Sequence, residues 1–292
     1  MTAFYSPLRY PGGKNKLSKF ISQVCIKNDI KGEYIEPYAG GAAVALFLLM
    51  EGYVSSITIN DFDRSIFALW YSILNYTDDF CRLIKKTKIN IKNWKKFKSI
   101  QKNKQKASLL ELGFSTFFLN RTNISGIIEG GVIGGIKQKG NYKIDCRFNK
   151  ENLITRIKDI AQYKDQINVY NLDAIDLIKK LKKKSKNSQT IFYFDPPYYV
   201  KGESLYFNHY KHDDHEKVCN MIKKIKNAKW IVSYDDTDEI KKLYSCFRRI
   251  EYSLTYTANK SKKGKEVLFL SDNLIEPELL NLPKFANASL LF

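Results

Sequence analysis

Residues 191–199 read Ile-Phe-Tyr-Phe-Asp-Pro-Pro-Tyr-Tyr, an apolar run that ends in a carboxylate, two prolines and aromatic rings. Proline has no backbone N–H, fixes its own φ and pushes the preceding residue towards extended geometry. The backbone at Asp195-Pro196-Pro197-Tyr198 therefore offers carbonyl acceptors, few donors and little freedom. We expect a strand ending in a rigid corner that holds an amino group by both hydrogens, with Tyr198 stacked on a flat ring. A plain strand end followed by a turn is the alternative.

A unit near the N-terminus has the pattern of a nucleotide-binding α/β sheet. A strand expected over 33–36 leads into a loop with Gly40-Gly41, followed by an apolar helix over 42–50 and a strand over 55–59. Asp61 lies twenty residues after Gly41. Glycines let a backbone approach a ligand closely, and a carboxylate at the next strand end accepts hydrogen bonds from a ribose. Alternatively, the glycines pack tightly and Asp61 caps a helix.

The stretch from about 66 to 165 has helical periodicity. Residues 85–106 contain ten lysines and no acid. Such a run is either a solvated helix face or a surface that follows phosphates. The polar, glycine-rich stretch 120–142 fits either reading of base edges or a long surface connection. We expect an inserted helical domain, 66–165, within an α/β domain formed by residues 1–65 and 166–292.

Alternating elements resume after the insert. We expect a strand over 168–170, a helix beginning at Asp173, and then the strand that ends at Asp195. A helix over 213–226, a strand over 230–233 and a helix within 235–244 follow. Two last strands, 248–254 and 266–270, have no helix between them, which indicates an antiparallel pair. The whole pattern predicts a Rossmann-like, mostly parallel sheet with one antiparallel edge strand.

The charge balance predicts a polyanionic partner. The chain carries 49 Lys and Arg against 30 Asp and Glu, a net charge of +19, which suits nucleic acid or an acidic membrane face. No apolar run has membrane-spanning length and the N-terminus lacks a signal-peptide pattern, so we favour nucleic acid. Five scattered cysteines without a CxxC pair argue against a disulfide framework or a zinc site and suit the cytoplasm.

The three histidines lie close together in the sequence. His209, His212 and His215 have the spacing of three that could place metal ligands on one helical face. Asp213 and Glu216 have the spacing of a capping box, which would begin a helix there and separate the three rings. We therefore expect no metal site.

These motifs give the chain a family resemblance. It resembles the Dam-like (D12 class) adenine-specific DNA N6-methyltransferases, and the matches follow the family's order over nearly the whole chain. They are Arg9-Tyr10-Pro11-Gly12-Gly13-Lys14, Glu36-Pro37-Tyr38-Ala39-Gly40-Gly41, Asn60-Asp61, Asn120-Arg121 with Ser125-Gly126, and Asp195-Pro196-Pro197-Tyr198. A kinase-like P-loop is excluded, since Leu8 and Asn15 stand where that motif requires glycine and Ser or Thr.

The resemblance implies transfer of a methyl group from S-adenosylmethionine to N6 of an adenine flipped out of double-stranded DNA, without a metal. The implied cofactor contacts are Tyr10, Lys14, Pro37, Ala39, Gly40, Gly41, Asp61, Asp173 and Asp195. The catalytic residues that we expect are Asp195, Pro196 and Tyr198. The DNA contacts that we expect in the helical insert are Lys95, Lys96, Lys98, Asn120, Arg121, Asn123 and Tyr142.

Other features of the enzyme are expected from the same reasoning. We expect a monomer in the cytoplasm, associated with the nucleoid in a prokaryote or encoded by a phage, with no membrane attachment. Any cognate restriction endonuclease would act separately. Residues 125–130 differ from the aromatic and basic sequence usual in members that methylate GATC, so no recognition sequence is assigned. N4-cytosine methylation of DNA, N6-adenine methylation of RNA, and a catalytically dead DNA-binding homologue are the alternatives.

Overall fold

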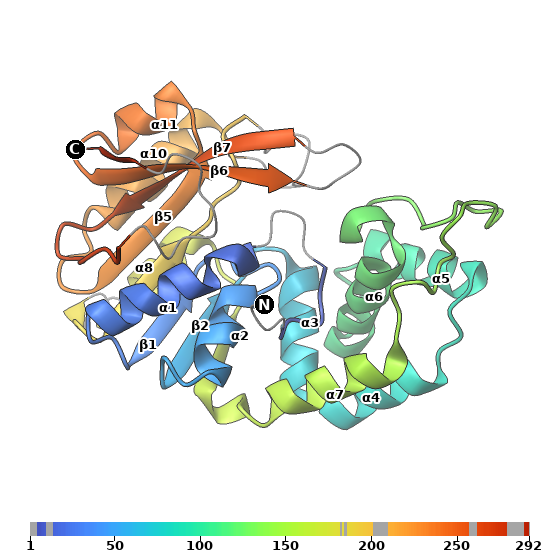
Figure 1. The fold of residues 1–292 in the computed structure, drawn as a ribbon. Coiled ribbons are helices and arrows are strands. Elements are labelled where there is room, and N and C mark those ends of the chain that lie inside the picture. Colours follow the sequence, from blue (N-terminus) through green and yellow to red (C-terminus); the bar gives the residue numbers. More distant parts are fainter. Residues whose placement is uncertain are drawn as a thin grey trace.

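The computed structural model describes residues 5–9, 14–181, 183, 186–200, 210–256, 262–278 and 289–291; Tyr10 and His209 lie outside them. In these residues one sheet is flanked by helices, and further helices extend from one side of it (Figure 1). The strands are β1 (Glu33–Glu36), β2 (Ser56–Asn60), β3 (Ile167–Tyr170), β4 (Thr190–Phe194), β5 (Lys229–Asp235), β6 (Arg248–Tyr256), β7 (Lys262–Leu270) and β8 (Ser289–Leu291).

The helices follow the alternation that the sequence predicts. A short 3₁₀ turn, η1 (Lys14–Leu17), leads into the first of them. The α-helices are α1 (Ser18–Lys27), α2 (Ala43–Met50), α3 (Arg64–Asn75), α4 (Thr77–Lys86), α5 (Ile91–Lys102), α6 (Leu109–Thr122), α7 (Lys150–Ala161), α8 (Ala174–Lys180), α10 (His212–Ile222) and α11 (Asp238–Leu243).

The strand order defines a doubly wound sheet. Among the described residues eight strands lie in the order β3-β2-β1-β4-β5-β7-β6-β8. Strands β1 to β5 are parallel, and β7 runs antiparallel to both β5 and β6. The Rossmann-like sheet with an antiparallel edge is confirmed, and that edge comprises three strands because β7 lies between β5 and β6 and β8 pairs with β6. The order reverses between β1 and β4, and open α/β sheets bind ligands beside the carboxyl ends of such a strand pair.

Each face of the sheet is covered by its own helices. Alternate residues of a strand point to opposite faces, so Phe192 and Phe194 pack with α8, α10 and α11. Ile191 and Tyr193 pack on the other face with α1, α2 and α3. Asp195 follows Phe194 and continues the alternation on the α1 and α2 face. The strand register therefore sets the side of the sheet on which its carboxylate lies.

The described residues between β2 and β3 form the helices α3 to α7, a short 3₁₀ turn on either side of α7, and one isolated bridge. Their core is aromatic: Phe80 lies edge-to-face on Phe114 and Phe117, with ring centroids 5.5 and 5.4 Å apart. Such contacts add about 0.5–1.5 kcal/mol beyond the area buried. These rings belong to the same core as the α1 and α2 face of the sheet. The helical part is thus anchored on the sheet, and the domain boundaries at 66 and 165 stay a proposal.

Gly113 lies where α6 crosses α3. A Cβ built at Gly113 would meet the Ala68 carbonyl oxygen and lie 2.8 Å from Ser72 Oγ. We expect Gly113→Ala to lower the free energy of unfolding by about 1–3 kcal/mol, because the two helices must separate. Urea unfolding followed by circular dichroism measures this change. Gly131→Ala is the matched control, since nothing lies within 4 Å of its Cβ; equal stability of the two variants would contradict the close crossing.

The start of α10 differs from the sequence prediction. The capping box expected from Asp213 and Glu216 was wrong in register, because α10 begins at His212 and its cap is Lys211. The Lys211 backbone N–H donates to Asp214 Oδ2 at 3.1 Å. Both described histidines therefore lie within this helix.

Candidate active site

The loop after β1 and the end of β2 are joined at the switch point of the sheet. Gly40 has φ 45° and Ala42 has φ 46°, left-handed values that glycine adopts without strain. The Gly40 N–H donates to Asp61 Oδ2 at 3.0 Å, and the Asp63 N–H donates to Oδ1 at 2.9 Å. Asp63, not Asp61, caps α3 through the Ser65 N–H. Each oxygen of Asp61 thus accepts one backbone hydrogen bond, and burial raises the pKa of this carboxyl to about 7.

Asn60 fixes three strand ends at once. Its amide donates to the carbonyl oxygens of Pro37 at 2.8 Å and Leu172 at 3.0 Å, and its Oδ1 accepts from the Leu172 N–H at 3.0 Å. Asp173 follows directly and caps α8 through the Ile175 N–H. In the sequence motif Asn60 has no role of its own beside Asp61. Here Asn60 is a residue that sets the spacing of the loops after β1, β2 and β3.

The N-terminal segment contacts the same loop. Ser6 Oγ donates to the Gly41 carbonyl oxygen at 2.6 Å, and Trp70 Nε1 donates to the Gly40 carbonyl oxygen at 2.9 Å. Ala39 is buried, and its N–H bonds to the Asn60 carbonyl oxygen at 2.8 Å. The predicted cofactor residues Pro37, Ala39, Gly40, Gly41 and Asp61 thus lie together. Tyr10 falls outside the described residues.

The two carboxylate oxygens of Asp195 differ in their contacts with the described residues. Ser233 Oγ donates to Oδ1 at 2.7 Å, and Lys14 Nζ lies 3.2 Å from the same oxygen. Among the described residues no hydrogen bond reaches Asp195 Oδ2 or the Pro196 carbonyl oxygen. The Asp195 side chain is 21% exposed. Asp195 Oδ2 and the carbonyl oxygen of the buried Pro196 are thus two acceptors, on consecutive residues, that receive no donor from this part of the chain.

A buried charge network lies behind this corner. Lys14 Nζ is 3.6 Å from Glu266 Oε1, and the two side chains are 5% and 1% exposed. The Tyr198 hydroxyl accepts a hydrogen bond from Lys14 Nζ and donates to Glu266 Oε1, and the Tyr252 hydroxyl donates to Glu266 Oε2. Burial opposes the charge of Lys14, but Asp195 and Glu266 raise its pKa well above the ordinary value. Glu266 belongs to none of the sequence motifs.

The Tyr198 ring is buried and contacts Lys14, so only part of it could stack on a base. Its side chain is buried, with 6% of the residue exposed, and Lys14 Nζ lies 4.7 Å from its ring centroid. Stacking on a base requires the remaining ring face, so that role stays a prediction. The following backbone is fixed as well, because the Tyr199 and Val200 N–H groups both donate to the carboxylate of Asp235, at 2.8 and 3.0 Å.

The buried carboxyl of Glu36 should make the free energy of unfolding depend on pH. It is 5% exposed and accepts a hydrogen bond from the Tyr34 hydroxyl at 2.9 Å; burial raises its pKa from an ordinary 4.5 to about 8. Between these values the folded state holds a proton that the unfolded chain has released. The free energy of unfolding therefore falls with rising pH, by up to about 1.4 kcal/mol per pH unit. Glu36→Gln removes this contribution and flattens the fall.

Urea unfolding across about pH 5 to 8 checks this expectation. The exposed Glu151→Gln on α7 is the matched control and keeps the wild-type slope. Asp61, whose pKa is also raised by burial, contributes a residual slope to all three proteins. Equal slopes for wild type and Glu36→Gln would show that Glu36 is ionised in the folded protein.

The predicted DNA contacts fall into two groups, and the asparagines belong to the first. Asn120 is 1% exposed: its Oδ1 accepts from the Arg9 N–H at 2.8 Å, and its Nδ2 donates to the Arg9 and Gly126 carbonyl oxygens, both at 2.9 Å. Asn123 is fully buried and accepts from Trp94 Nε1 at 2.7 Å. Both amides hold backbone and side chains of the protein in place, so base contacts by these two side chains stay a prediction.

Arg121 and Lys98 are also engaged within the protein. Arg121 Nε donates to the Arg147 carbonyl oxygen at 2.7 Å, and burial together with nearby arginines lowers its pKa to about 10. Lys98 Nζ donates to the Ile128 carbonyl oxygen at 3.1 Å and lies 3.6 Å from Glu129 Oε2. Arg121 keeps its charge at neutral pH, and Lys98 supports the loop after α6.

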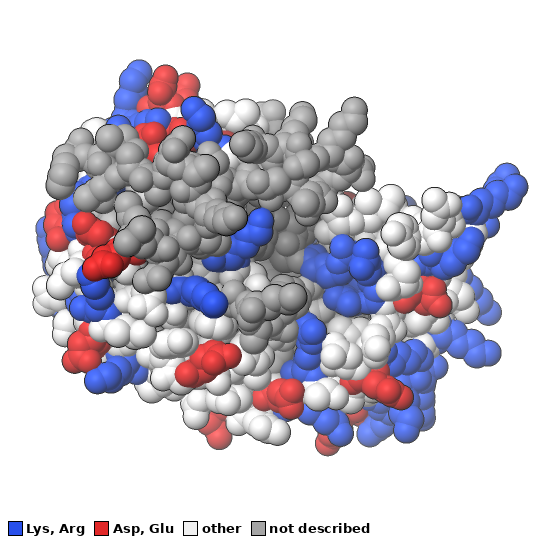
Figure 2. Space-filling view, in the orientation of Figure 1, with Lys and Arg blue, Asp and Glu red and all other residues white. Residues whose placement is uncertain are grey.

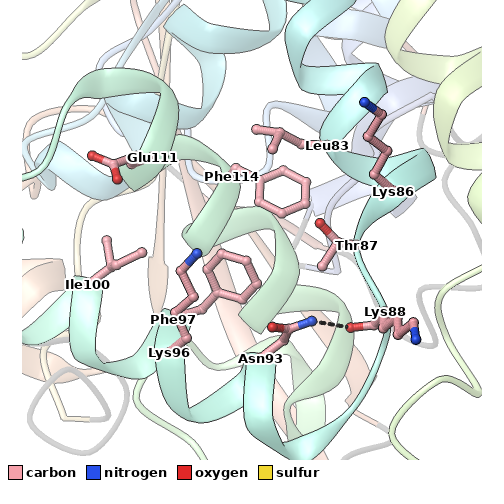
Figure 3. A pocket seen from close by; sticks show the side chains of 10 residues that line it. All are labelled: Leu83, Lys86, Thr87, Lys88, Asn93, Lys96, Phe97, Ile100, Glu111 and Phe114. Atoms are coloured by element: carbon pink, nitrogen blue, oxygen red, sulfur yellow. Dashed lines mark hydrogen bonds between the residues drawn. The ribbon is translucent and has the colours of Figure 1, made fainter.

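The second group is exposed. Lys95 and Lys96 lie on the outer face of α5, and Tyr142 is 67% exposed with the Arg147 guanidinium 6.0 Å from its ring centroid. Lys and Arg side chains gather over the helical part of the molecule, on the right of Figure 2. A pocket between α4, α5 and α6 is lined by Phe97, Phe114 and Lys96 among others (Figure 3). This face of α5 therefore suits a polyanion.

Two further possibilities for the described residues are metal ligation and a membrane-spanning helix. No group of three His, Cys, Asp or Glu side chains in them could hold a metal ion. In α10, His212 Nδ1 lies 3.1 Å from the Tyr199 hydroxyl and His215 Nδ1 lies 2.9 Å from the Tyr234 hydroxyl. None of the helices within the described ranges is long and apolar enough to cross a membrane.

Comparison with known proteins places this geometry in a family. A family model for D12 class N6 adenine-specific DNA methyltransferases matches residues 10–258. The Type II methyltransferase M.MjaIII of Methanocaldococcus jannaschii is 22% identical over 262 residues, which cover 82% of this chain and 88% of that protein. The resemblance inferred from the motifs is confirmed. Because the matched residues make up most of the chain, it belongs to the D12 class of N6 adenine-specific DNA methyltransferases, enzymes that methylate adenine in DNA.

Proposed function

We propose that the acceptor corner formed by Asp195 and Pro196 binds the exocyclic amine of an adenine flipped out of duplex DNA and directs methylation to its N6. The observation that supports this proposal is that the two oxygens of the Asp195 carboxylate have different contacts. Ser233 and Lys14 both contact Oδ1, while Oδ2 and the Pro196 carbonyl oxygen have no donor among the described residues. Two adjacent acceptors match the two hydrogens of an amine.

The residues at the switch point fit S-adenosylmethionine. Gly40 adopts a left-handed φ and has no Cβ that would oppose close approach of a ligand to the backbone. The Asp61 carboxylate lies beside it at the end of β2 and suits ribose hydroxyls. Lys14 balances only one of the two carboxylates, Asp195 and Glu266, so the corner suits a cation. We propose that these residues, with Pro37, Ala39, Gly41, Asp173 and Tyr10, hold the cofactor.

When bound, S-adenosylmethionine supplies an electrophilic methyl group on its sulfonium. The adenine amine is a weak nucleophile because its lone pair is delocalised into the ring. Asp195 Oδ2 and the Pro196 carbonyl oxygen each accept one amine hydrogen, which favours a pyramidal nitrogen with its lone pair directed away from the corner. Transfer would form the new N–C bond and break the S–C bond of the sulfonium, leaving a neutral thioether. The methylated amine would thereby become acidic, and Asp195 Oδ2 is placed to receive its proton. Preorganised acceptors and fixed orientation supply the acceleration.

Access to the corner requires base flipping. A base within the duplex cannot reach an acceptor between Lys14 and Ser233, and extruding it costs a few kcal/mol. We propose that Lys95 and Lys96 hold flanking phosphates and that Tyr142 and Arg121 lie at the DNA, while Asn120, Asn123 and Lys98 position the loop after α6. Phosphate contacts set register, and base contacts set sequence.

Identification of the modified base tests this proposal. Plasmid DNA incubated with the protein and methyl-labelled S-adenosylmethionine is digested to nucleosides and analysed by mass spectrometry. N6-methyladenine is expected, and sequencing of the same DNA gives the recognition sequence. N4-methylcytosine as the product, or transfer to structured RNA in preference to duplex DNA, would overturn the proposal. The described helices include none that could span a membrane; we further propose a cytoplasmic monomer that acts independently of any restriction endonuclease.

A further inference from the structure

Glu266 lies at the centre of the buried network without being part of any motif. In β7 it is paired with Asp235 of β5 and Tyr252 of β6, and it points to the same face as Leu268. It is 1% exposed. A buried carboxylate is retained only when charges and hydrogen bonds compensate its desolvation. Here the compensating groups, Lys14 and the Tyr198 hydroxyl, are the ones that also contact the acceptor corner.

The Lys14 ammonium is shared between two carboxylates. Its Nζ lies 3.2 Å from Asp195 Oδ1 and 3.6 Å from Glu266 Oε1. Without Glu266 the ammonium would move fully onto Asp195, where it could occupy the oxygen that the amine requires. Glu266 also fixes the Tyr198 hydroxyl, three residues after Asp195 in a backbone stiffened by two prolines. Both contacts act on the position of Asp195.

We propose that Glu266 is a positioning residue for methyl transfer. It draws Lys14 to one side of Asp195 and anchors Tyr198, so that Asp195 Oδ2 stays available as an acceptor for the target amine. The inference rests on the function proposed for Asp195. It assigns to Glu266 no contact with the target base itself.

Glu266→Gln tests the proposal because glutamine keeps the size and one acceptor while removing the charge. We expect kcat to fall roughly ten- to hundred-fold, as small misplacements of a reacting group do. The dissociation constants for duplex DNA and for S-adenosylmethionine should stay within about twofold of wild type. Glu251→Gln on β6 is the matched control. Its carboxylate lies 3.1 Å from Lys241 and 3.2 Å from Arg249, in a separate ion-pair group, and its kcat should equal that of wild type.

The pH profile separates positioning from a merely structural role. Burial, together with the charge of Glu266, raises the pKa of Asp195 above its ordinary value, although Lys14 and Ser233 oppose the rise. Removing the Glu266 charge therefore lowers the pKa of Asp195, and the acid limb of kcat/KM moves to lower pH in Glu266→Gln. The titratable or charged groups that act on Asp195 are Lys14, Glu36, Tyr193 and Glu266. The Tyr198 and Tyr252 hydroxyls contact Lys14 and Glu266 instead.

Tyr252→Phe gives an independent test if Glu266→Gln does not fold. It removes the hydroxyl that donates to Glu266 Oε2 and keeps the buried carboxylate of Glu266. We therefore expect kcat to fall by about three- to tenfold with the fold intact. Folded Glu266→Gln with wild-type kcat and pH profile would overturn the proposal, as would wild-type kcat in Tyr252→Phe. Absence of adenine methylation by the wild-type protein would instead refute the proposed function.

Discussion

Asp195→Ala is expected to abolish methyl transfer while the protein still binds DNA. The substitution removes the carboxylate that Ser233 and Lys14 hold in place, and with it one of the two acceptors for the amine. Removing a single preorganised polar group from an active site reduces kcat by about a hundred- to a thousand-fold. We expect a larger loss here, because Lys14 is left beside Glu266 without its second partner. Single-turnover transfer of labelled methyl groups to duplex DNA measures the effect.

Asp195→Asn tests whether methyl transfer depends on the charge of this side chain or only on its size. The asparagine amide keeps the size of the side chain, but it presents a donor or a neutral acceptor to the amine, so a comparable loss of kcat is expected. Asp176→Asn on α8 is the matched control, since its carboxylate pairs with Lys179 at the surface, with both side chains 61% exposed. DNA binding, followed by fluorescence anisotropy, should be unchanged in all three. Turnover by Asp195→Ala within tenfold of wild type would show that methyl transfer does not depend on this carboxylate.

The sheet and the motif residues could be predicted from local sequence. Short segments rich in β-branched and aromatic residues, each followed by polar side chains, identify β1, β2, β4 and β5 to within a few residues. Their order along the chain implies that the loops after β1 and β4 meet, since both strands are parallel and adjacent. The position of Asp61 beside Gly40 follows from the same logic.

Glu266 could not be found in this way, because its neighbours in sequence suggest a different environment. It follows Lys-Gly-Lys at 263–265, a composition typical of an exposed hairpin. Only the insertion of β7 between β5 and β6 buries it, and that pairing depends on contacts distant in sequence. The alternation of Glu266 with Leu268 and Leu270 was the one local signal that it shares their face.

Asn120 and Asn123 were identified from the sequence, but their hydrogen-bond partners could not be predicted from it. A polar amide after an apolar helix is equally compatible with a base contact and with a buried clamp on the backbone, and sequence does not distinguish them. The structure satisfies both amides internally: Asn120 brackets the Arg9 backbone, and Asn123 binds Trp94 and the carbonyl oxygens of Ile127 and Ile128. Which partner a buried amide takes depends on the tertiary fold around it.

The exposed lysines of α5 should carry much of the affinity for DNA. Lys92, Lys95 and Lys96 share the outer face of this helix, and each phosphate neutralised releases about 0.9 of a counterion. If each lysine neutralises one phosphate, replacing all three with glutamine should weaken binding roughly a hundred-fold near 0.15 M salt. The slope of log Kd against log salt should fall by about 2.7. The loss should be equal for all DNA sequences, since phosphate contacts carry no base information.

Lys223, Lys224 and Lys226 provide the control for net charge. They lie exposed in the turn after α10, on the opposite face of the sheet from Asp195, and their replacement with glutamine changes the charge by the same three units. That triple variant should keep the affinity and most of the salt slope of wild type. If both triple variants lose affinity equally, the overall charge and not the α5 face determines binding. A loss confined to one DNA sequence in the α5 variant would instead assign these lysines to base recognition.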